Sequence, residues 1–262
     1  MKVVLFCGGL GLRLRDVSDE IPKPMMMIGN RPILWHVMKY YAHFGHKDFI
    51  LCLGYRSDVI KSYFLNYSEA VSNDFVLASG GRDLTLLSKD IEDWRITFVD
   101  TGVLSSIGQR LLAVRDHVAG EEVFLANYSD GLTDLDLPRM IDRFNAEKKV
   151  AAFLCVRPPL SYHGVTLDDR DQVTRIRPLS EEGPLINGGY FVLRGTIFDY
   201  LGPGEDVVGD AFPRLIPKHL LMGYRHEGFW ASMDTFKDKQ ALDQMIARGE
   251  TPWELWKRRP PS

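Results

Sequence analysis

Glycines and a cation follow an apolar run at the start of the chain. The run is Val3–Cys7, and the residues after it include Gly8, Gly9, Gly11 and Arg13. Because glycine has no Cβ, main-chain N–H groups there can close on phosphate oxygens, and a helix that began after them would add its positive dipole end. Lys23 supplies a second cation nearby. The glycines alone suit an ordinary strand-to-helix turn equally well, but together with the two cations they favour a polyphosphate site.

Two aspartates, Asp130 and Asp234, stand at the edges of predicted elements. Asp130 follows the apolar run Val123–Ala126, and Asp234 lies just ahead of a helical pattern. Taken singly, such a residue is more often a helix cap. Two carboxylates from distant segments can instead hold one Mg²⁺ while phosphate oxygens and water complete its coordination, which is how Mg²⁺ binds near nucleotides. The pair is therefore the candidate metal site.

Two other phosphate-binding classes do not fit the glycine segment. A dinucleotide fingerprint needs a third glycine where Leu14 stands, and it needs an acidic residue at the end of the next strand. The next apolar run, Phe49–Leu53, ends in Gly54 and Tyr55 instead. A Walker loop would need Gly-Lys-Ser/Thr, which does not follow here. An NAD-dependent oxidoreductase is accordingly the least favoured of the functions considered.

Apolar runs rich in β-branched and aromatic residues alternate with amphipathic stretches, which predicts an α/β fold in a single domain. We expect a mainly parallel open sheet flanked by helices, with a small elaboration toward the C-terminus. The predicted strands are Val3–Cys7, Phe49–Leu53, Ile96–Val99, Val123–Ala126, Ala151–Val156 and Gly189–Leu193. The predicted helices are Pro32–His43, Ser57–Tyr67, Pro138–Glu147 and Asp234–Gly249. Ligands of such sheets bind beyond the carboxyl ends of the strands, where the glycines and both aspartates are expected.

The amino-acid composition limits which binding partners and which cellular compartment we expect for the protein. The chain has 262 residues with 32 basic against 35 acidic side chains, so its overall charge calls for neither nucleic acid nor a membrane surface. No run approaches the roughly 20 apolar residues of a membrane span. Its three cysteines lie in apolar runs without C-x-x-C spacing, as expected of reduced buried thiols. We expect a soluble, unprocessed, cytoplasmic protein.

Taken in order along the chain, these motifs resemble the sugar-1-phosphate nucleotidyltransferases, and most closely the glucose-1-phosphate cytidylyltransferases. The likeness runs almost end to end. It rests on Gly8–Leu14, Lys23–Met25, Arg31–His36, Gly54–Arg56, Val59–Lys61, Val99–Gly102, Gly108–Leu111, Ser129–Gly131, Ile186–Gly189, Gly228–Trp230 and Met233–Thr235.

The resemblance implies a substrate pair, a cofactor and a set of site residues. A nucleoside triphosphate, with CTP favoured, would react with a sugar 1-phosphate, with glucose 1-phosphate favoured. Arg13, Lys23 and Arg110 would contact the triphosphate, and Asp130 and Asp234 would hold Mg²⁺. Gly164 and Asn187 would help to seat the sugar, and Trp230 could wall its pocket. Residues of about 1–130 would form the nucleotide half, about 150–240 the sugar-phosphate half and about 250–262 a tail. The family often forms homo-oligomers.

Four positions depart from the family pattern. Leu12 stands where Thr or Ser is usual, Cys7 replaces a small residue, and Ser129 replaces a glycine. The family's Glu-Lys-Pro segment, whose lysine grips the sugar phosphate, is shortened here to Val173–Pro178 and has no lysine. Arg177 is the candidate substitute. Its guanidinium would bind the phosphate through a planar fork of N–H donors, whereas a lysine ammonium acts as a point charge. Two alternatives stay open: a catalytically weak nucleotide-binding or sugar-nucleotide-binding regulatory protein on the same fold, and the same reaction with UTP or dTTP and another sugar phosphate.

Overall fold

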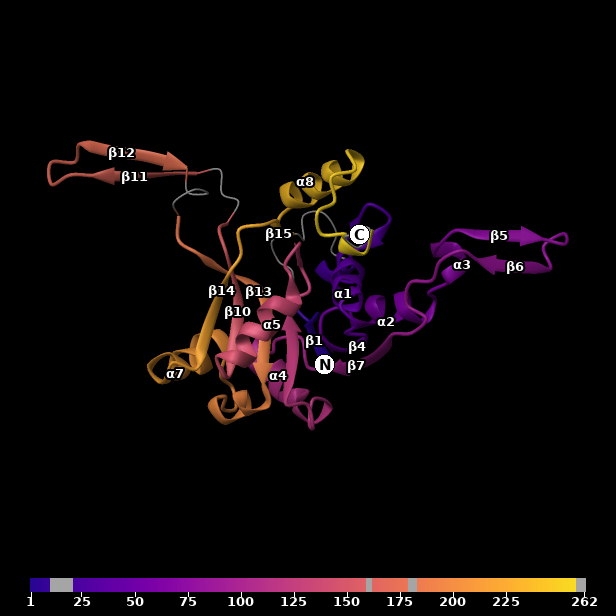
Figure 1. The fold of residues 1–262 in the computed structure, drawn as a ribbon, viewed down its shortest axis with the longest axis horizontal. Helices are drawn as coiled ribbons and strands as arrows, with labels where there is room; N and C mark the ends of the chain where they lie inside the picture. The colour runs from indigo at the N-terminus through magenta and orange to yellow at the C-terminus, as the bar shows by residue number, and fades with distance from the viewer. Residues whose placement is uncertain (10–20, 159–161, 179–182, 258–262) are drawn as a thin grey trace.

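The structure is a computed structural model that describes residues 1–9, 21–158, 162–178 and 183–257. Its centre is a seven-stranded sheet with the order β14-β10-β13-β8-β1-β4-β7 (Figure 1). These strands are β1 (Lys2–Phe6), β4 (Asp48–Leu53), β7 (Arg95–Asp100), β8 (Val123–Asn127), β10 (Ala151–Val156), β13 (Ile186–Arg194) and β14 (Leu221–Arg225). β13 runs antiparallel to both β10 and β8, whereas the other four pairings are parallel. The predicted mainly parallel sheet is confirmed.

Successive side chains of the sheet strands point alternately into two apolar cores, one on each face of the sheet. In β1, Val3 and Leu5 enter one core, and Val4 and Phe6 enter the other. The first core is covered by α1 (Ile33–His43), α2 (Ser57–Leu65) and α5 (Leu137–Ala146). The second is covered by α4 (Ile107–Ala113), the π-helical turn η5 (Val207–Ala211) and α7 (Phe212–Leu215). A strand buried on both faces explains why the sequence of β1 is continuously apolar.

Four short strand pairs surround the central sheet. They are β2 (Met27–Ile28) with β3 (Arg31–Pro32), β5 (Phe75–Ala78) with β6 (Asp83–Leu86), β9 (Gly131–Thr133) with β15 (Trp230–Ser232), and β11 (His163–Leu167) with β12 (Val173–Pro178). Two of these pairs project from the body as arms, β5–β6 on the right and β11–β12 on the upper left of Figure 1. The remaining helical elements are η2 (Lys23–Met25), α3 (Glu69–Ser72), η3 (Arg115–His117), η4 (Gly195–Tyr200), η6 (Ile216–Lys218), α8 (Phe236–Ala247) and η7 (Leu255–Lys257).

The predicted elements are all present, and the structure adds others. Each of the six predicted strands and four predicted helices matches an observed element within a few residues. The strand β14, the helix α4 and the β5–β6 arm were not predicted. β14 was missed because its sequence, LMGYR, combines few β-branched residues with a glycine.

The expected C-terminal tail is in part a packed segment. Trp253 is 1% exposed, and its ring lies 5.4 Å from that of Phe229. Trp256 packs edge-on against Trp35 of α1 at 5.8 Å. Because two large aromatic rings anchor it, the chain up to Lys257 belongs to the body. The segment predicted as a tail from about residue 250 packs on the body as far as Lys257, and residues 258–262 lie outside the described part.

The state of the cysteines and the length of the helices relate to two further predictions, reduced buried thiols and no membrane span. All three cysteines are free thiols, and Cys7 and Cys52 are buried. Burial raises the pKa of the Cys7 thiol to about 12, which leaves it protonated at neutral pH. Within the described residues, the helices are too short or too polar for any of them to cross a bilayer.

Candidate active site

The small β9–β15 pair brings the two predicted metal ligands together. Asp130 directly precedes β9, and Asp234 follows β15 after one residue. The strands are antiparallel, with Gly131 opposite Ser232, so the start of one lies beside the end of the other. The backbone N–H of Met233 donates to the carbonyl of Asp130 at 2.9 Å, which fixes the two turns side by side.

Lys23 joins the two carboxylates. Its Nζ donates to Asp130 Oδ2 at 2.7 Å and to Asp234 Oδ1 at 2.7 Å, so the two carboxylate oxygens lie within twice that distance of each other. Lys23 begins the short turn η2, in which the next residues, Pro24 and Met25, are buried in the body. The three predicted residues therefore form one cluster, which is called the Lys23 cluster below.

The charges of the Lys23 cluster are coupled. Burial by itself would lower the pKa of Lys23, but the attraction of Asp130 and Asp234 and their hydrogen bonds outweigh it, so the pKa is raised. Burial raises the pKa of Asp130, and the Lys23 ammonium opposes that rise. With Lys23 charged and both carboxylates ionised, the cluster has an excess negative charge that a divalent cation would neutralise.

The donor set fits Mg²⁺ bound together with a nucleotide. The described residues contain no group of three or more His, Cys, Asp or Glu side chains that could enclose a metal ion by themselves. Mg²⁺ commonly takes one or two carboxylates and completes its shell with phosphate oxygens and water. Asp130 and Asp234 supply those two carboxylates. Lys23 contacts one oxygen of each carboxylate, Asp130 Oδ2 and Asp234 Oδ1, so a metal ion bound to the same side chains would compete with its ammonium for their negative charge.

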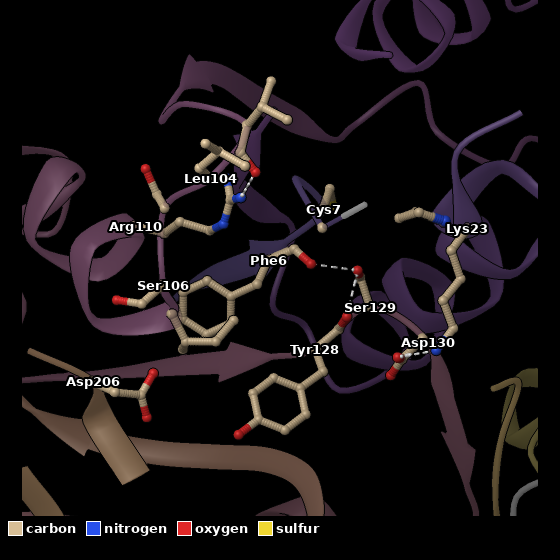
Figure 2. Close-up of a pocket in the computed structure, with 15 residues that line it drawn as sticks. Phe6, Cys7, Lys23, Leu104, Ser106, Arg110, Tyr128, Ser129, Asp130 and Asp206 are labelled. Atoms are coloured by element: carbon tan, nitrogen blue, oxygen red, sulfur yellow. Dashed lines mark hydrogen bonds and ion pairs between the residues drawn. The ribbon is translucent and has the colours of Figure 1, made fainter. Parts of the chain in front are cut away.

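A cavity of about 570 Å³ opens beside the Lys23 cluster (Figure 2). This volume is in the range of small-molecule and cofactor sites. Lys23 and Asp130 lie at one end of the cavity, and Ser106, Tyr128 and Asp206 line its other part. It sits beyond the carboxyl ends of β1 and β8, as expected of ligand sites in open sheets.

The predicted glycines are only partly described. Gly8 and Gly9 follow β1, and Gly9 lines the cavity. Gly11 and Arg13 fall within residues 10–20, outside the described residues, so their assignment to the triphosphate stays a prediction. Leu12, which stands where Thr or Ser is usual in the family, also lies outside the described residues.

Arg110 lines the cavity but directs its guanidinium at the protein. The side chain is 2% exposed and donates to the carbonyls of Gly8 at 2.9 Å, Leu53 at 3.1 Å and Val103 at 3.2 Å, and to the hydroxyl of Thr101 at 2.7 Å. These bonds tie together the loops that follow β1, β4 and β7. A direct contact between Arg110 and a phosphate stays a prediction.

Asn187 and Trp230, which were predicted to border the sugar, lie close together. The Asn187 side chain donates to the Tyr128 hydroxyl at 3.2 Å and accepts from the Gly189 N–H at 2.9 Å. The Trp230 indole N–H donates to the carbonyl of Gly188 at 2.9 Å. Trp230 also lines a second cavity of about 450 Å³. Both residues therefore border the start of β13, next to the first cavity.

Gly164 and Arg177 are opposite each other on the β11–β12 arm. Arg177 is exposed, and neither residue is among the described residues that line the two cavities above. The structure thus brings these two residues together, but it does not bring them to the Lys23 cluster. Their contact with a sugar phosphate stays a prediction.

Asp206 and Ser106 are among the lining residues of the cavity that sequence analysis missed. Asp206 directly precedes η5 and Ser106 directly precedes α4, and each lies in a stretch without a phosphate-binding pattern. The sequence does contain one signal for the position of Ser106. Ser106 is followed three residues later by Gln109, and the two form a capping box that marks the start of α4.

Comparison with known proteins finds relatives along nearly the whole chain. Residues 2–242 match a family model described as nucleotidyl transferase. A probable glucose-1-phosphate cytidylyltransferase of Bacillus subtilis (strain 168) is 37% identical over 258 residues, which covers 98% of this chain and 100% of that protein. The glucose-1-phosphate cytidylyltransferase of Salmonella typhi is 38% identical over 262 residues, with the same coverage.

Solved structures have the same fold. HddC from Yersinia pseudotuberculosis matches with a TM-score of 0.64 and 20% identity, covering 94% of this chain and 99% of that one. A UDP-glucose pyrophosphorylase complexed with UDP-glucose matches with a TM-score of 0.68 and 15% identity, covering 95% and 98%. The family match over most of the chain and the relatives aligned along nearly their full lengths lead to one conclusion: the chain belongs to the nucleotidyl transferase family.

Proposed function

We propose that the protein transfers a cytidylyl group from CTP to a sugar 1-phosphate, with glucose 1-phosphate as the favoured acceptor. The observation that carries the proposal is the Lys23 cluster at one end of a nucleotide-sized cavity. The names of the relatives that align over the whole chain favour CTP and glucose 1-phosphate over other substrate pairs.

The reaction joins two anions. An oxygen of the sugar phosphate attacks the α-phosphorus of the nucleotide in line, the bond from that phosphorus to the bridging oxygen breaks, and pyrophosphate leaves. The attacking oxygen is already anionic, so the reaction needs no general base. Catalysis then consists of positioning the substrates and neutralising their charge.

The residues of the chain have distinct parts in this mechanism. Lys23 turns from the carboxylates to the phosphates and neutralises their charge, and Arg13 adds a second cation there. Asp130 and Asp234 would hold Mg²⁺, which would neutralise negative charge on the phosphate oxygens. Asn187 and Trp230 border the sugar, and Arg177 replaces the missing lysine.

Pyrophosphate release tests the proposal. The protein is mixed with Mg²⁺, glucose 1-phosphate and each nucleoside triphosphate in turn. We expect the fastest release with CTP and none when EDTA removes the metal. Faster pyrophosphate release with another nucleotide would contradict the choice of CTP. No pyrophosphate release with any of the nucleotides would contradict glucose 1-phosphate as the acceptor.

One observation favours a second candidate, a regulatory protein that binds the nucleotide without turnover. The β12 segment has arginines but no lysine to grip the sugar phosphate. Calorimetry with CTP, together with a panel of sugar 1-phosphates, separates the two functions. Tight binding without turnover on the whole panel would favour the regulatory protein.

We also propose that the protein forms a homo-oligomer and is located in the cytoplasm. Both arms expose apolar side chains, among them Leu77 and Leu84 on β5–β6 and Val165 and Ile176 on β11–β12. Such surfaces favour a homo-oligomer, which sedimentation velocity would detect. The free thiols favour the reducing cytoplasm.

A further inference from the structure

The part of the cavity away from the Lys23 cluster contains a carboxylate, that of Asp206. Figure 2 shows this carboxylate pointing into the cavity, between Ser106 and Tyr128. If Lys23 takes the phosphates as proposed above, the base of the nucleotide extends toward this other part. What Asp206 does there therefore rests on the proposed function.

The position of Asp206 is fixed by its own turn. One carboxylate oxygen, Oδ1, accepts from the backbone N–H groups of Val208 at 2.9 Å and Gly209 at 3.2 Å. The Asp206 backbone N–H donates to the Asp210 side chain at 2.7 Å. These bonds hold the side chain in one orientation, which is the preorganisation that a specific contact needs.

The turn is also held against α4. A Cβ on Gly108 would stand 2.1 Å from the Glu205 carbonyl oxygen and 2.9 Å from Asp206 Cα, so the two backbones touch. The Ser106 hydroxyl donates to the same Glu205 carbonyl at 3.2 Å. Asp206 is thus attached to the loop that lines the cavity.

The other polar side chains near Asp206 are already engaged. The Arg110 guanidinium makes four hydrogen bonds to protein oxygens, and the Ser105 hydroxyl donates to the Thr101 carbonyl. The Ser106 hydroxyl also accepts from the Gln109 N–H. Within the described residues, no ion pair neutralises Asp206. Burial raises the pKa of Tyr128 to about 12, and the nearby Asp206 charge adds to that rise.

A carboxylate at this place distinguishes pyrimidine bases by their exocyclic group. An ionised carboxylate only accepts hydrogen bonds. Cytosine presents an amino group at C4, which donates, whereas uracil and thymine present a carbonyl oxygen there, which accepts. We propose that Asp206 accepts a hydrogen bond from the cytosine amino group and so selects CTP against UTP and dTTP.

Paired binding measurements test this role. Calorimetry with Mg²⁺ and without sugar phosphate gives the dissociation constants of CTP and UTP for the wild type, Asp206→Asn and Asp206→Ser. The wild type should bind CTP at least tenfold more tightly than UTP. In Asp206→Asn the ratio should fall by about tenfold to a hundredfold, because the asparagine amide can donate to the uracil oxygen.

Two variants guard against a purely structural effect. Asn and Ser both retain an oxygen that can cap the turn, so Asp206→Ser should also lose discrimination while it keeps the fold. Asp210→Asn is the matched control, since it alters the bond to the Asp206 N–H and leaves the cavity carboxylate in place. Its CTP to UTP ratio should equal that of the wild type.

The outcomes separate this inference from the proposed function. Equal binding of CTP and UTP by the wild type, or an unchanged ratio in both Asp206 variants, would overturn the role of Asp206 even if the enzyme turns over CTP. A shifted ratio in a protein that releases no pyrophosphate with any sugar phosphate would support the role of Asp206 and contradict the activity.

Discussion

The guanidinium of Arg110 occupies the space where a side chain at Gly8 would begin. A Cβ on Gly8 would stand 2.0 Å from Arg110 Nη1 and 2.9 Å from the backbone nitrogen of Gly54. The missing side chain at Gly8 therefore lets a buried arginine join three loops under the cavity.

Gly8→Ala should destabilise the protein by about 1–3 kcal/mol, because the added methyl group overpacks a buried contact. Urea unfolding measures this loss. Gly9→Ala is the matched control, since a Cβ there would meet no atom of the described residues within 4 Å. We expect its stability to stay within about 0.5 kcal/mol of the wild type while its affinity for CTP falls. Equal stability losses in the two variants would contradict the packing explanation.

The Lys23 cluster was predictable from the sequence because it depends on local patterns and one general rule. An apolar strand followed by Asp130, and Asp234 followed by an amphipathic helix, are visible without coordinates. That ligands collect at the carboxyl ends of strands then predicts their convergence. The hydrogen bonds of Lys23 to both carboxylates are the new information.

The remaining parts of the site depend on contacts between distant segments. Asp206 reaches the cavity only because the Gly108 backbone touches the turn that contains it, and nothing in either segment encodes that meeting. Arg110 looks like a phosphate ligand in sequence, yet its partners are carbonyls of three separate loops. Trp256 is likewise packed by Trp35 of α1 rather than by its own neighbours in sequence.

Lys23→Met should reduce turnover by about two to three orders of magnitude, because one preorganised cation is lost from the transition state. The variant also leaves Asp130 and Asp234 without their shared counter-ion. We therefore expect Mg²⁺ alone, without nucleotide, to raise its melting temperature more than that of the wild type. Steady-state kinetics and thermal unfolding measure the two effects.

The control for this variant is Lys47→Met, whose ion pair with Asp93 is on the exposed surface. It should retain wild-type turnover and the wild-type response to Mg²⁺. A Lys23→Met enzyme with normal turnover would remove Lys23 from the catalytic residues.

Asp130→Asn and Asp234→Asn should each raise the Mg²⁺ concentration needed for half-maximal turnover, because a neutral amide binds Mg²⁺ more weakly than a carboxylate does. Metal titrations at saturating CTP measure that concentration. Asp142→Asn, an exposed carboxylate on α5, serves as the control. An unchanged metal requirement in both test variants would place the metal elsewhere.

Arg177→Ala should raise the KM for the sugar 1-phosphate by about tenfold, because a charge-assisted hydrogen bond is lost, and should leave the KM for CTP unchanged. Arg175→Ala is the control, since Arg175 points to the same side of β12 from two register pairs further along. Its KM values should match those of the wild type. Equal effects of the two variants would indicate a role of the whole arm rather than of Arg177.

The stability of the fold should fall as the pH drops below about 6.5, because His36 is buried as a neutral side chain. His36 is 3% exposed, and its Nε2 lies 3.3 Å from the Ile28 carbonyl oxygen. Burial lowers its pKa to about 4. The unfolded chain, with an ordinary pKa near 6.5, takes up the proton first, so lowering the pH favours unfolding.

The stabilisation from His36 is complete above about pH 6.5 and is lost progressively toward pH 4, where about 3 kcal/mol of it should be gone. Urea unfolding at a series of pH values measures the slope. His36→Gln removes the titrating group and keeps a donor for the Ile28 carbonyl, so its stability should fall less steeply over this interval. Some slope should persist, because burial also lowers the pKa of His46 to about 4. Parallel slopes in the wild type and His36→Gln would show that His36 does not control the acid sensitivity.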